Sequence, residues 1–245
     1  MAYRYWQAGL HIQRDAMVCV ALQQGRSGWG LRRWWWQQNA PDATDVQRIV
    51  TLRQWRREMP LQHRVAVAFP AAGTIKRTLP APGLTLRDSE QAQWIASSMA
   101  QQLEMPAGAL ACDYHDVAQR GLRVTAARQQ EVVRLYRLAR DAGLRVGSVT
   151  PDASALQHYF PWLTDSAAGL SWFDGEQWLW ATREDWGCGA EPAPDAIRCC
   201  SDADGFDPWR CLSQLQPPLP EAGDRFTIAL ALALALAGRC RVQAG

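Results

Sequence analysis

Three short runs of apolar and aromatic residues open the chain, separated by turn-forming residues. The runs span residues 3–13, 16–24 and 28–37, with QRD and GRSG between them. Apolar runs punctuated in this way predict a three-stranded antiparallel meander. Because side chains alternate between the faces of a strand, part of each run should be sheet core. The expected core residues of the first two strands are Trp6, Leu10, Ile12, Val18, Val20 and Leu22.

A helix and a buried strand are predicted after the meander. Apolar residues recur at three-residue steps over 44–59, and Asp42 or Thr44 can serve as the N-cap. Residues 64–70, RVAVAFP, form the continuous apolar run that is typical of a strand buried on both faces. This element order opens ribonuclease-H-like and actin-like α/β folds, although order alone does not single out one fold.

A second, smaller unit is predicted from residue 74. Thr85 and Asp88 form a T-x-x-D capping box at the start of a helix, and the strands LACDYHDV and GLRVTAA can then pair. A helix over 128–141 should place four apolar residues on one face: Val132, Leu135, Tyr136 and Ala139. The unit is therefore predicted to be a β-α-β-β-α insertion into the first unit. It divides the chain into residues 1–73, 74–149 and 150–245.

The last third of the chain should complete the first unit. A strand ends at Pro151, which then lies in the first turn of a helix over PDASALQHYFPWL. AGLSWF and EQWLWATRE are predicted strands, joined by the turn signal DGE. Residues 187–225 predict at most one short strand, AIRCC, before a buried helix at 226–238. That last apolar run is shorter than the roughly 20 residues that span a bilayer.

Composition and charge exclude several classes of site. The net charge is +2, so binding of nucleic acid or an anionic membrane would have to be local. Only Lys76 among the 26 basic residues is a lysine, a bias that we assign to genome composition. The seven cysteines form no CxxC pair and the four histidines are scattered, so we expect free thiols and no metal site. The N-terminus lacks a signal-peptide pattern, which predicts a cytoplasmic protein.

Six stretches, taken in order, give the chain a resemblance to a known family. They are RVAVAFPAAGTIKRTLP, DSEQAQWIASSMAQQL, VTPDASALQHYFPWL, EQWLWATR, GFDPW and FTIALALALA. Together they resemble the PilM-like type IV pilus assembly proteins over nearly the whole chain. The resemblance implies a truncated actin-like ATPase fold: subdomain 1A, an inserted 1C subdomain of the FtsA and PilM type at 74–149, and a reduced 2A-like part. The chain after the second hairpin is too short for the helices of a 2B subdomain.

The first phosphate hairpin of that family is altered here. Its pattern G-I-D-I-G-S-S-S-V-K matches Gly9 to Val18, so that His11 replaces the carboxylate and Gln13 replaces a glycine. Glycine lets backbone N–H groups approach phosphate, and neutral imidazole is a poor ligand for Mg²⁺. Asp15 follows in the turn, where we expect it to be solvated. We therefore expect a degenerate loop at these positions, no ATP or Mg²⁺ cofactor, and no catalytic residue.

The other nucleotide-contacting elements are altered too. Trp172 and Phe173 stand where the family has the compact pattern D-I-G-A, and only Gly205 remains of the adenine-side glycines. An actin-like ATPase stays an alternative that the fold permits and these changes oppose.

The resemblance implies a non-catalytic cytoplasmic adaptor of a type IV pilus-like DNA-uptake machine. PilM-like proteins bind the cytoplasmic N-terminal tail of a bitopic inner-membrane protein of the PilN type, in a groove between 1A and 1C. The adaptor would thus sit at the inner membrane through its partner, without inserting into it. A strand edge or an apolar slot can hold such a tail. The expected groove residues are Phe69, Ile75, Arg77, Trp94 and Val124. A homodimer through the tryptophan-rich EQWLWATREDW is left open.

A further alternative is direct binding of single-stranded DNA by LRRWWWQQ. Tryptophan stacks on bases and arginine neutralises phosphate, so Arg33 and Trp35 are the residues to test. Strand alternation puts Trp34 and Trp36 on one face and Trp35 on the other, so at least one face should be core.

Overall fold

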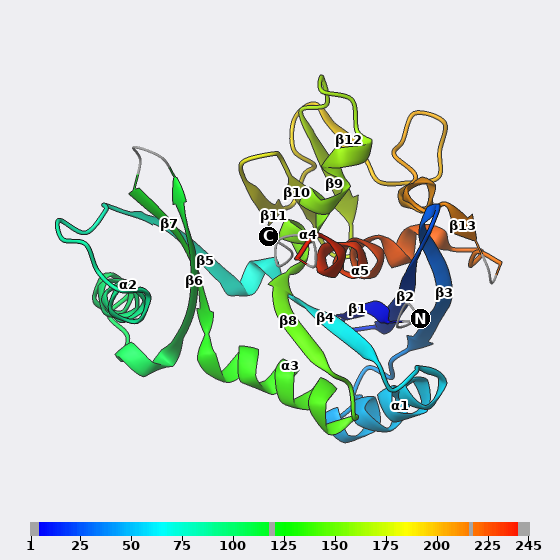
Figure 1. The fold of residues 1–245 in the computed structure, drawn as a ribbon, viewed down its shortest axis with the longest axis horizontal. Coiled ribbons are helices and arrows are strands. Elements are labelled where there is room, and N and C mark those ends of the chain that lie inside the picture. The colour runs from blue at the N-terminus through cyan, green and yellow to red at the C-terminus, as the bar shows by residue number, and fades with distance from the viewer. Residues whose placement is uncertain (1–4, 118–120, 216–217, 240–245) are drawn as a thin grey trace. The chain divides into compact units, whose positions relative to one another are not determined.

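The computed structural model describes residues 5–117, 121–215 and 218–239, and these form two compact units (Figure 1). The larger unit comprises the chain through Ala71 and from Tyr136 onward, and the smaller unit spans Ala72–Leu135. The insertion thus begins close to the expected residue 74. It ends well before residue 149, because the strand at 146–151 pairs with the sheet of the larger unit.

A six-stranded sheet with the order β13-β3-β2-β1-β4-β8 organises the larger unit. Strands β1, β2 and β3 are the predicted antiparallel meander, and β4 and β8 extend the sheet in parallel to β1. Of the six expected core residues, Leu10, Val18, Val20 and Leu22 are fully buried, whereas Trp6 and Ile12, at the two ends of β1, are half-buried. The strands are β1 (Trp6–Ile12), β2 (Ala16–Gly25), β3 (Gly28–Gln38), β4 (His63–Phe69), β8 (Val146–Pro151) and β13 (Gln214–Leu215).

Helix α1 (Asp45–Glu58) connects the meander to β4. Thr44 is its N-cap: the Thr44 hydroxyl accepts a hydrogen bond from the Gln47 backbone N–H, and the Gln47 side chain accepts one from the Thr44 N–H at 2.7 Å. Leu52 and Trp55 are buried beneath the helix. The sequence therefore located both this helix and one of its two candidate caps.

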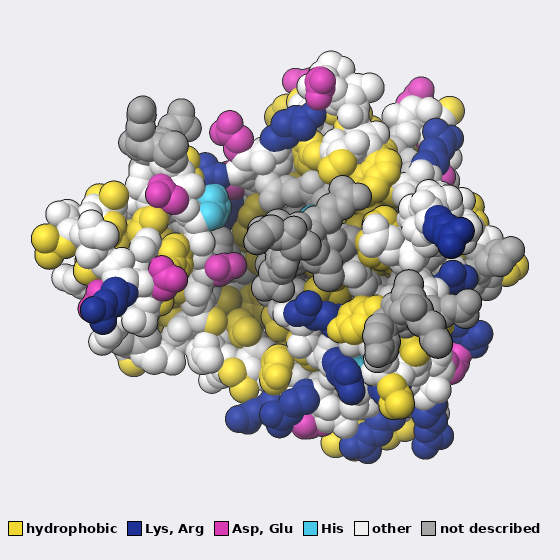
Figure 2. All heavy atoms as spheres, in the orientation of Figure 1, with side chains coloured by type: hydrophobic (Ala, Val, Ile, Leu, Met, Phe, Trp, Pro, Cys, Tyr) yellow, Lys and Arg dark blue, Asp and Glu magenta, His cyan; other side chains and the backbone are white. Residues whose placement is uncertain are grey.

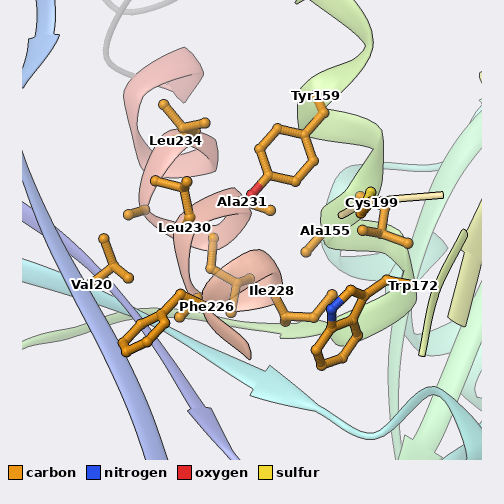
Figure 3. Close-up of a cluster of buried hydrophobic side chains, with 14 of the residues drawn as sticks. Val20, Ala155, Tyr159, Trp172, Cys199, Phe226, Ile228, Leu230, Ala231 and Leu234 are labelled. Carbon is orange, nitrogen blue, oxygen red and sulfur yellow. The ribbon is translucent and has the colours of Figure 1, made fainter. Parts of the chain in front are cut away.

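Helix α5 (Thr227–Arg239) is the centre of the core in the larger unit. It packs against β1, β2 and β4, and the same hydrophobic cluster includes residues of a second sheet, with the order β11-β10-β9-β12 (Figure 3). Residues 228–233 of the helix are fully buried. The predicted buried helix is therefore confirmed. The strands of the second sheet are β9 (Gly169–Phe173), β10 (Trp178–Ala181), β11 (Trp186–Gly189) and β12 (Ala196–Arg198).

Two predictions for the last third of the chain were wrong. The segment after Pro151 is one turn of α-helix, α4 (Asp152–Ala155), followed by a 3₁₀ helix at Leu156–Trp162. Pro161 lies in that stretch and provides no N–H for an α-helical hydrogen bond. Residues 187–225 contain most of β11 together with β12 and β13, rather than one strand at most. These strands have two to four residues, too few for a strand period to be visible.

The smaller unit is a three-stranded sheet with the order β5-β7-β6, with helix α2 packed in the same core. The predicted pairing of LACDYHDV with GLRVTAA is confirmed. The predicted capping box was wrong, because α2 begins at Asp88 and the Glu90 carboxylate accepts from the Arg87 N–H at 2.9 Å. The elements are β5 (Thr74–Leu79), α2 (Asp88–Gln102), β6 (Leu110–Val117) and β7 (Gly121–Arg128).

Helix α3 (Gln129–Asp141) follows β7 and continues into the larger unit. Leu138 and Ala139 are buried, whereas Tyr136 is exposed. The prediction that Tyr136 shares the buried face was therefore wrong. Arg140, one turn further along, lies with its guanidinium carbon 5.9 Å from the centre of the Tyr136 ring.

Candidate functional site

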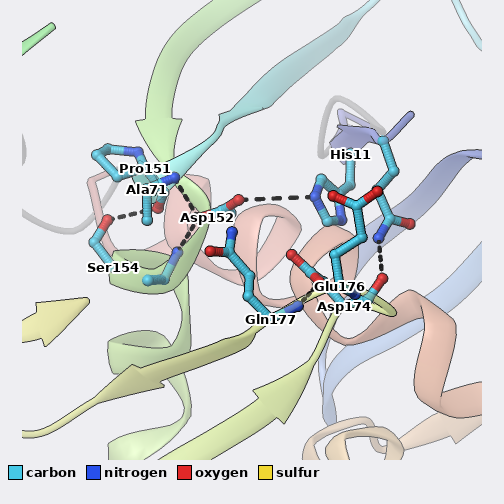
Figure 4. Close-up of polar contacts among 10 residues, drawn as sticks. His11, Ala71, Pro151, Asp152, Ser154, Asp174, Glu176 and Gln177 are labelled. Carbon is cyan, nitrogen blue, oxygen red and sulfur yellow. Dashed lines mark hydrogen bonds and ion pairs between the residues drawn. The ribbon is translucent and has the colours of Figure 1, made fainter. Parts of the chain in front are cut away.

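The β1–β2 turn and the β9–β10 turn, which match the two phosphate hairpins of the resemblance, are bonded to each other (Figure 4). The Gln13 side-chain amide donates a hydrogen bond of 3.1 Å to the Asp174 carbonyl. Next to it, the exposed Arg14 guanidinium lies 3.6 Å from the Glu176 carboxylate. The side chain that replaces the family's glycine therefore bridges the two turns.

Both the side chain and the backbone of Asp174 form hydrogen bonds within its own turn. Its Oδ1 accepts hydrogen bonds from the backbone N–H groups of Glu176 at 2.8 Å and Gln177 at 2.7 Å, and its N–H donates to the Gln177 carbonyl at 3.0 Å. Gly175 has φ +105, a conformation that favours glycine. The predicted DGE turn is confirmed, and Asp174 Oδ1 already accepts two backbone hydrogen bonds.

His11 lies buried at the end of β1 with its ring facing the second hairpin. The ring centre is 5.9 Å from that of Trp172, and Nε2 is 4.0 Å from Asp152 Oδ2. Burial lowers the pKa of His11 to about 4, so the imidazole is neutral at pH 7. Nδ1 is buried without a hydrogen-bond partner among the described residues. The position that the family gives to a carboxylate therefore holds an uncharged ring.

Asp152 is the buried acid that our sequence reasoning missed. Its Oδ1 accepts hydrogen bonds from the backbone N–H groups of Ala71 at 2.9 Å and Ala153 at 2.6 Å, which joins the end of β4 to the start of α4 (Figure 4). Burial raises the pKa of Asp152 to about 7. The one sequence signal was an acidic residue between a buried strand and a helix start. Its proximity to His11 is a tertiary contact between distant segments.

A hollow of about 380 Å³ lies beside the joined turns. Three acidic residues and one arginine are among the residues that line it, Asp15, Asp174, Asp224 and Arg225, together with aromatic residues of β3 and β9. Asp15 is exposed, as expected for a turn residue. Trp172 is buried and its indole donates to the Asp224 carbonyl at 2.8 Å. Because the lining has more negative than positive charge, it is a poor match for a triphosphate.

Similarity in sequence to a known protein identifies the family of this chain. No family model matches the chain. It is 40% identical over 256 residues to the DNA utilization protein HofM of Escherichia coli (strain K12), a match that covers 96% of this chain and 98% of that protein. The chain belongs to the HofM family.

Solved structures show that this HofM-family chain has the fold that the resemblance implied. A structure described as the PilM–PilN type IV pilus biogenesis complex matches with a TM-score of 0.67 and 15% identity, over 94% of this chain and 98% of that chain. The cytoplasmic domain of EpsL, an inner-membrane component of the Vibrio cholerae type II secretion system, matches with a TM-score of 0.60 and 10% identity, over 95% of each chain. The PilM-type, actin-like fold is therefore confirmed. Within the described residues, no helix is long and apolar enough to cross a membrane.

The five groove residues predicted for the HofM-family chain lie in different surroundings. Phe69 ends β4 in the larger unit and is buried. Ile75 and Arg77 lie on β5, an outer strand of the small sheet, where Ile75 is half-buried and Arg77 is exposed. Trp94 is half-buried on α2 and packs on the core of the smaller unit. Val124 pairs in register with Arg77 but is fully buried in that core, so it is not available as a surface contact.

Trp34 and Trp35, two of the tryptophans considered for DNA stacking, contact other residues within the fold. Trp35 is 6% exposed and stacks on Trp55 with 6.2 Å between ring centres. Trp34 donates to the Pro218 carbonyl at 2.9 Å, and Arg33 forms an ion pair with Glu58. The expectation that at least one face is core is confirmed. Trp35 is not placed to stack on bases.

Proposed function

We propose that this protein is a non-catalytic adaptor of a type IV pilus-like DNA-uptake machine, and that it binds the cytoplasmic N-terminal tail of a PilN-like or HofN-like inner-membrane protein. The observation that carries the proposal is the likeness in fold, over almost both full chains, to a structure described as a PilM–PilN complex. Membership of the HofM family adds the link to DNA utilization.

The joined hairpin turns support a role without nucleotide. The Gln13 side chain bonds the second turn, His11 is an uncharged ring in place of a carboxylate, and the adjacent hollow has an excess of acidic residues. Each of these features disfavours a magnesium polyphosphate, which needs backbone N–H groups, a hard oxygen ligand and positive charge. We propose that neither ATP nor Mg²⁺ is a cofactor.

The outer strand β5 is the favoured place for the tail. An extended peptide can add to the edge of a sheet, with alternate side chains seated in pockets. Ile75 and Arg77 lie two residues apart on β5, so their side chains share a face, and Trp94 packs on the same core. Of the five predicted groove residues, these three have exposed or partly exposed side chains, whereas Phe69 and Val124 are buried.

Isothermal titration with a synthetic peptide of the partner's tail tests the proposal. We expect micromolar binding that Mg-ATP leaves unchanged, and at least tenfold weaker binding by Ile75→Asp together with Arg77→Glu. Thr78→Ala, at an exposed position of the same strand, is the matched control. Binding that requires ATP would contradict the nucleotide-free role. The absence of any tail binding would overturn the adaptor proposal.

A further inference from the structure

Helix α1 presents apolar side chains on its outer face as well as its inner one. Val46 is 71% exposed and Val50 is 50% exposed. Positions four, seven and eleven residues after Val46 lie on the same face of the helix. Val46, Val50, Arg53 and Arg57 therefore form one stripe along the outer face of α1. Leu61, which is 75% exposed, follows the end of the helix. Leu52 and Trp55 fill the opposite, buried face. The outer apolar residues are therefore not explained by the core.

Arginines gather around this stripe. Residues 45–64 and 136–147 contain eight arginines and three acidic residues, although the whole chain has a net charge of only +2. Hydrogen bonds hold the two segments together: the Arg53 guanidinium donates to the Asp141 carbonyl at 3.1 Å, and that of Arg56 donates to the Gly143 carbonyl at 3.0 Å. Figure 2 shows the dark blue side chains gathered over α1 and the end of α3. We call this surface the arginine face.

The β4–β8 side of the arginine face is positive as well. The Val65 N–H donates to the Arg145 carbonyl, and the Arg145 N–H donates to His63 Nε2 at 3.1 Å. Arg64, the second residue of β4, and Arg145, which precedes β8, therefore lie at the same end of two neighbouring parallel strands. Burial lowers the pKa of His63, and the charges of Arg56 and Arg145 lower it further. His63 is therefore neutral at pH 7 and adds no charge of its own.

The acidic residues of the arginine face are already paired. Asp45 pairs with Arg48, Glu58 with Arg33 and Asp141 with Arg140. Four other arginines are exposed and form no ion pair within the part of the chain that the structure describes: Arg57, Arg64, Arg137 and Arg145. These guanidinium groups are available to an external anion.

We propose that the arginine face binds the anionic headgroups of a phospholipid bilayer. Guanidinium groups pair with lipid phosphates, and valine and leucine side chains among them gain from contact with the headgroup and acyl boundary. A nucleic-acid backbone would use the arginines but would give Val46, Val50 and Leu61 no apolar environment. The inference does not rest on tail binding.

Flotation of the full-length protein with phosphatidylcholine vesicles, with and without phosphatidylglycerol, tests this assignment. We expect binding only to the anionic vesicles, and weaker binding at high salt. Arg57→Gln, Arg64→Gln and Arg145→Gln should each weaken partitioning about fivefold, and together roughly a hundredfold. The matched control replaces the exposed Arg26, Arg198 and Arg210, which lie outside the arginine face, and changes the net charge by the same amount. Equal losses in both triple variants would overturn a localised site.

Substitution of the two valines distinguishes binding to a bilayer from binding to another polyanion. Val46→Ser with Val50→Ser should weaken vesicle binding severalfold and leave the melting temperature almost unchanged, because both side chains are exposed. A single-stranded oligonucleotide is the comparison ligand. The bilayer proposal would be overturned in favour of nucleic acid by two results together. The oligonucleotide would bind in a way that depends on the arginines and not on the valines, and the protein would bind the two vesicle types equally.

Discussion

Packing against α5 requires a glycine at position 9, where the phosphate hairpin of the resemblance also has one. A Cβ added at Gly9 would overlap the Ala229 carbonyl oxygen and would lie 2.8 Å from the Ala233 nitrogen, both on α5. Backbone atoms cannot move aside as a flexible side chain can. The glycine thus allows α5 to lie directly on β1, which accounts for its presence without any ligand.

Gly9→Ala should therefore destabilise the protein severely. Overpacking of a core typically costs about 1–3 kcal/mol, and a clash with helix backbone should lie at or above the upper end of that range. The free energy of unfolding in urea measures the effect. Gly83→Ala is the control, because nothing lies within 4 Å of the added Cβ there and its stability should be unchanged. An equal, small effect of the two substitutions would show that α5 does not need the close approach.

His11 and Asp152 should give stability two opposed dependences on pH. The pKa of Asp152 is raised to about 7 in the folded state, so its contribution to stability is present below about pH 4 and is lost as the pH rises to 7. The pKa of His11 is lowered to about 4, so its contribution grows as the pH rises from 4 to 6.5. The two dependences largely cancel in the wild type.

Single variants should separate the two dependences. Asp152→Asn keeps acceptors for both backbone N–H groups and leaves the His11 dependence, so stability should rise between pH 4 and 6.5. His11→Asn leaves the Asp152 dependence, so stability should fall over the same interval. Each slope is at most about 1.4 kcal/mol per pH unit. Urea unfolding at several pH values measures both, and parallel curves for the two variants would falsify this assignment.

Residue-scale prediction succeeded where the chemistry is local. The DGE signal located the turn at Asp174, and the resemblance aligned His11 and Gln13 with the carboxylate and the glycine of the family's first hairpin. The bond between Gln13 and Asp174 joins residues 161 positions apart, and the contact of His11 with Asp152 is also long-range. No spacing in the sequence records such pairs.

At the scale of elements, two threonines that looked equivalent in the sequence have different roles. Thr44 bonds the first turn of α1, whereas α2 begins at Asp88, three residues after Thr85, with Glu90 closing the turn. Thr44→Ala should cost about 1 kcal/mol of stability, the usual value for a lost N-cap. Thr85→Ala should cost almost nothing. Urea unfolding of the two variants distinguishes them, and a comparable loss at Thr85 would mean that the predicted capping box forms after all.

Long, strongly patterned elements were predictable and short ones were not. The meander, α1 and α5 extend over enough residues for a repeat or an apolar run to show. Strands β11 and β12 have four and three residues and exist because β10 and β9 offer them edges to pair with. The 3₁₀ helix after α4 packs against α5 in the core. In both cases the neighbouring elements, rather than local propensity, decide the conformation.

At the scale of the whole molecule, the two units have cores of very different size. The buried cluster of the larger unit spans both of its sheets and α5, whereas among the described residues that of the smaller unit has seven members, including Met99 and Val124. Small cores bury a smaller fraction of the chain's surface and are correspondingly marginal. Local unfolding in proteins follows such cooperative units.

Native-state hydrogen exchange should therefore resolve two opening free energies. Amides of β6 and β7 should share a lower value than amides of β1, β2 and β4, because their unit can open while the larger core stays closed. Met99→Ala should lower the first value by about 2–5 kcal/mol, or to the limit of that unit's stability, since it removes a fully buried side chain. The second value should stay unchanged. If the substitution lowered both values equally, the chain would unfold as one cooperative body, and variants on β5 would then alter the arginine face through stability alone.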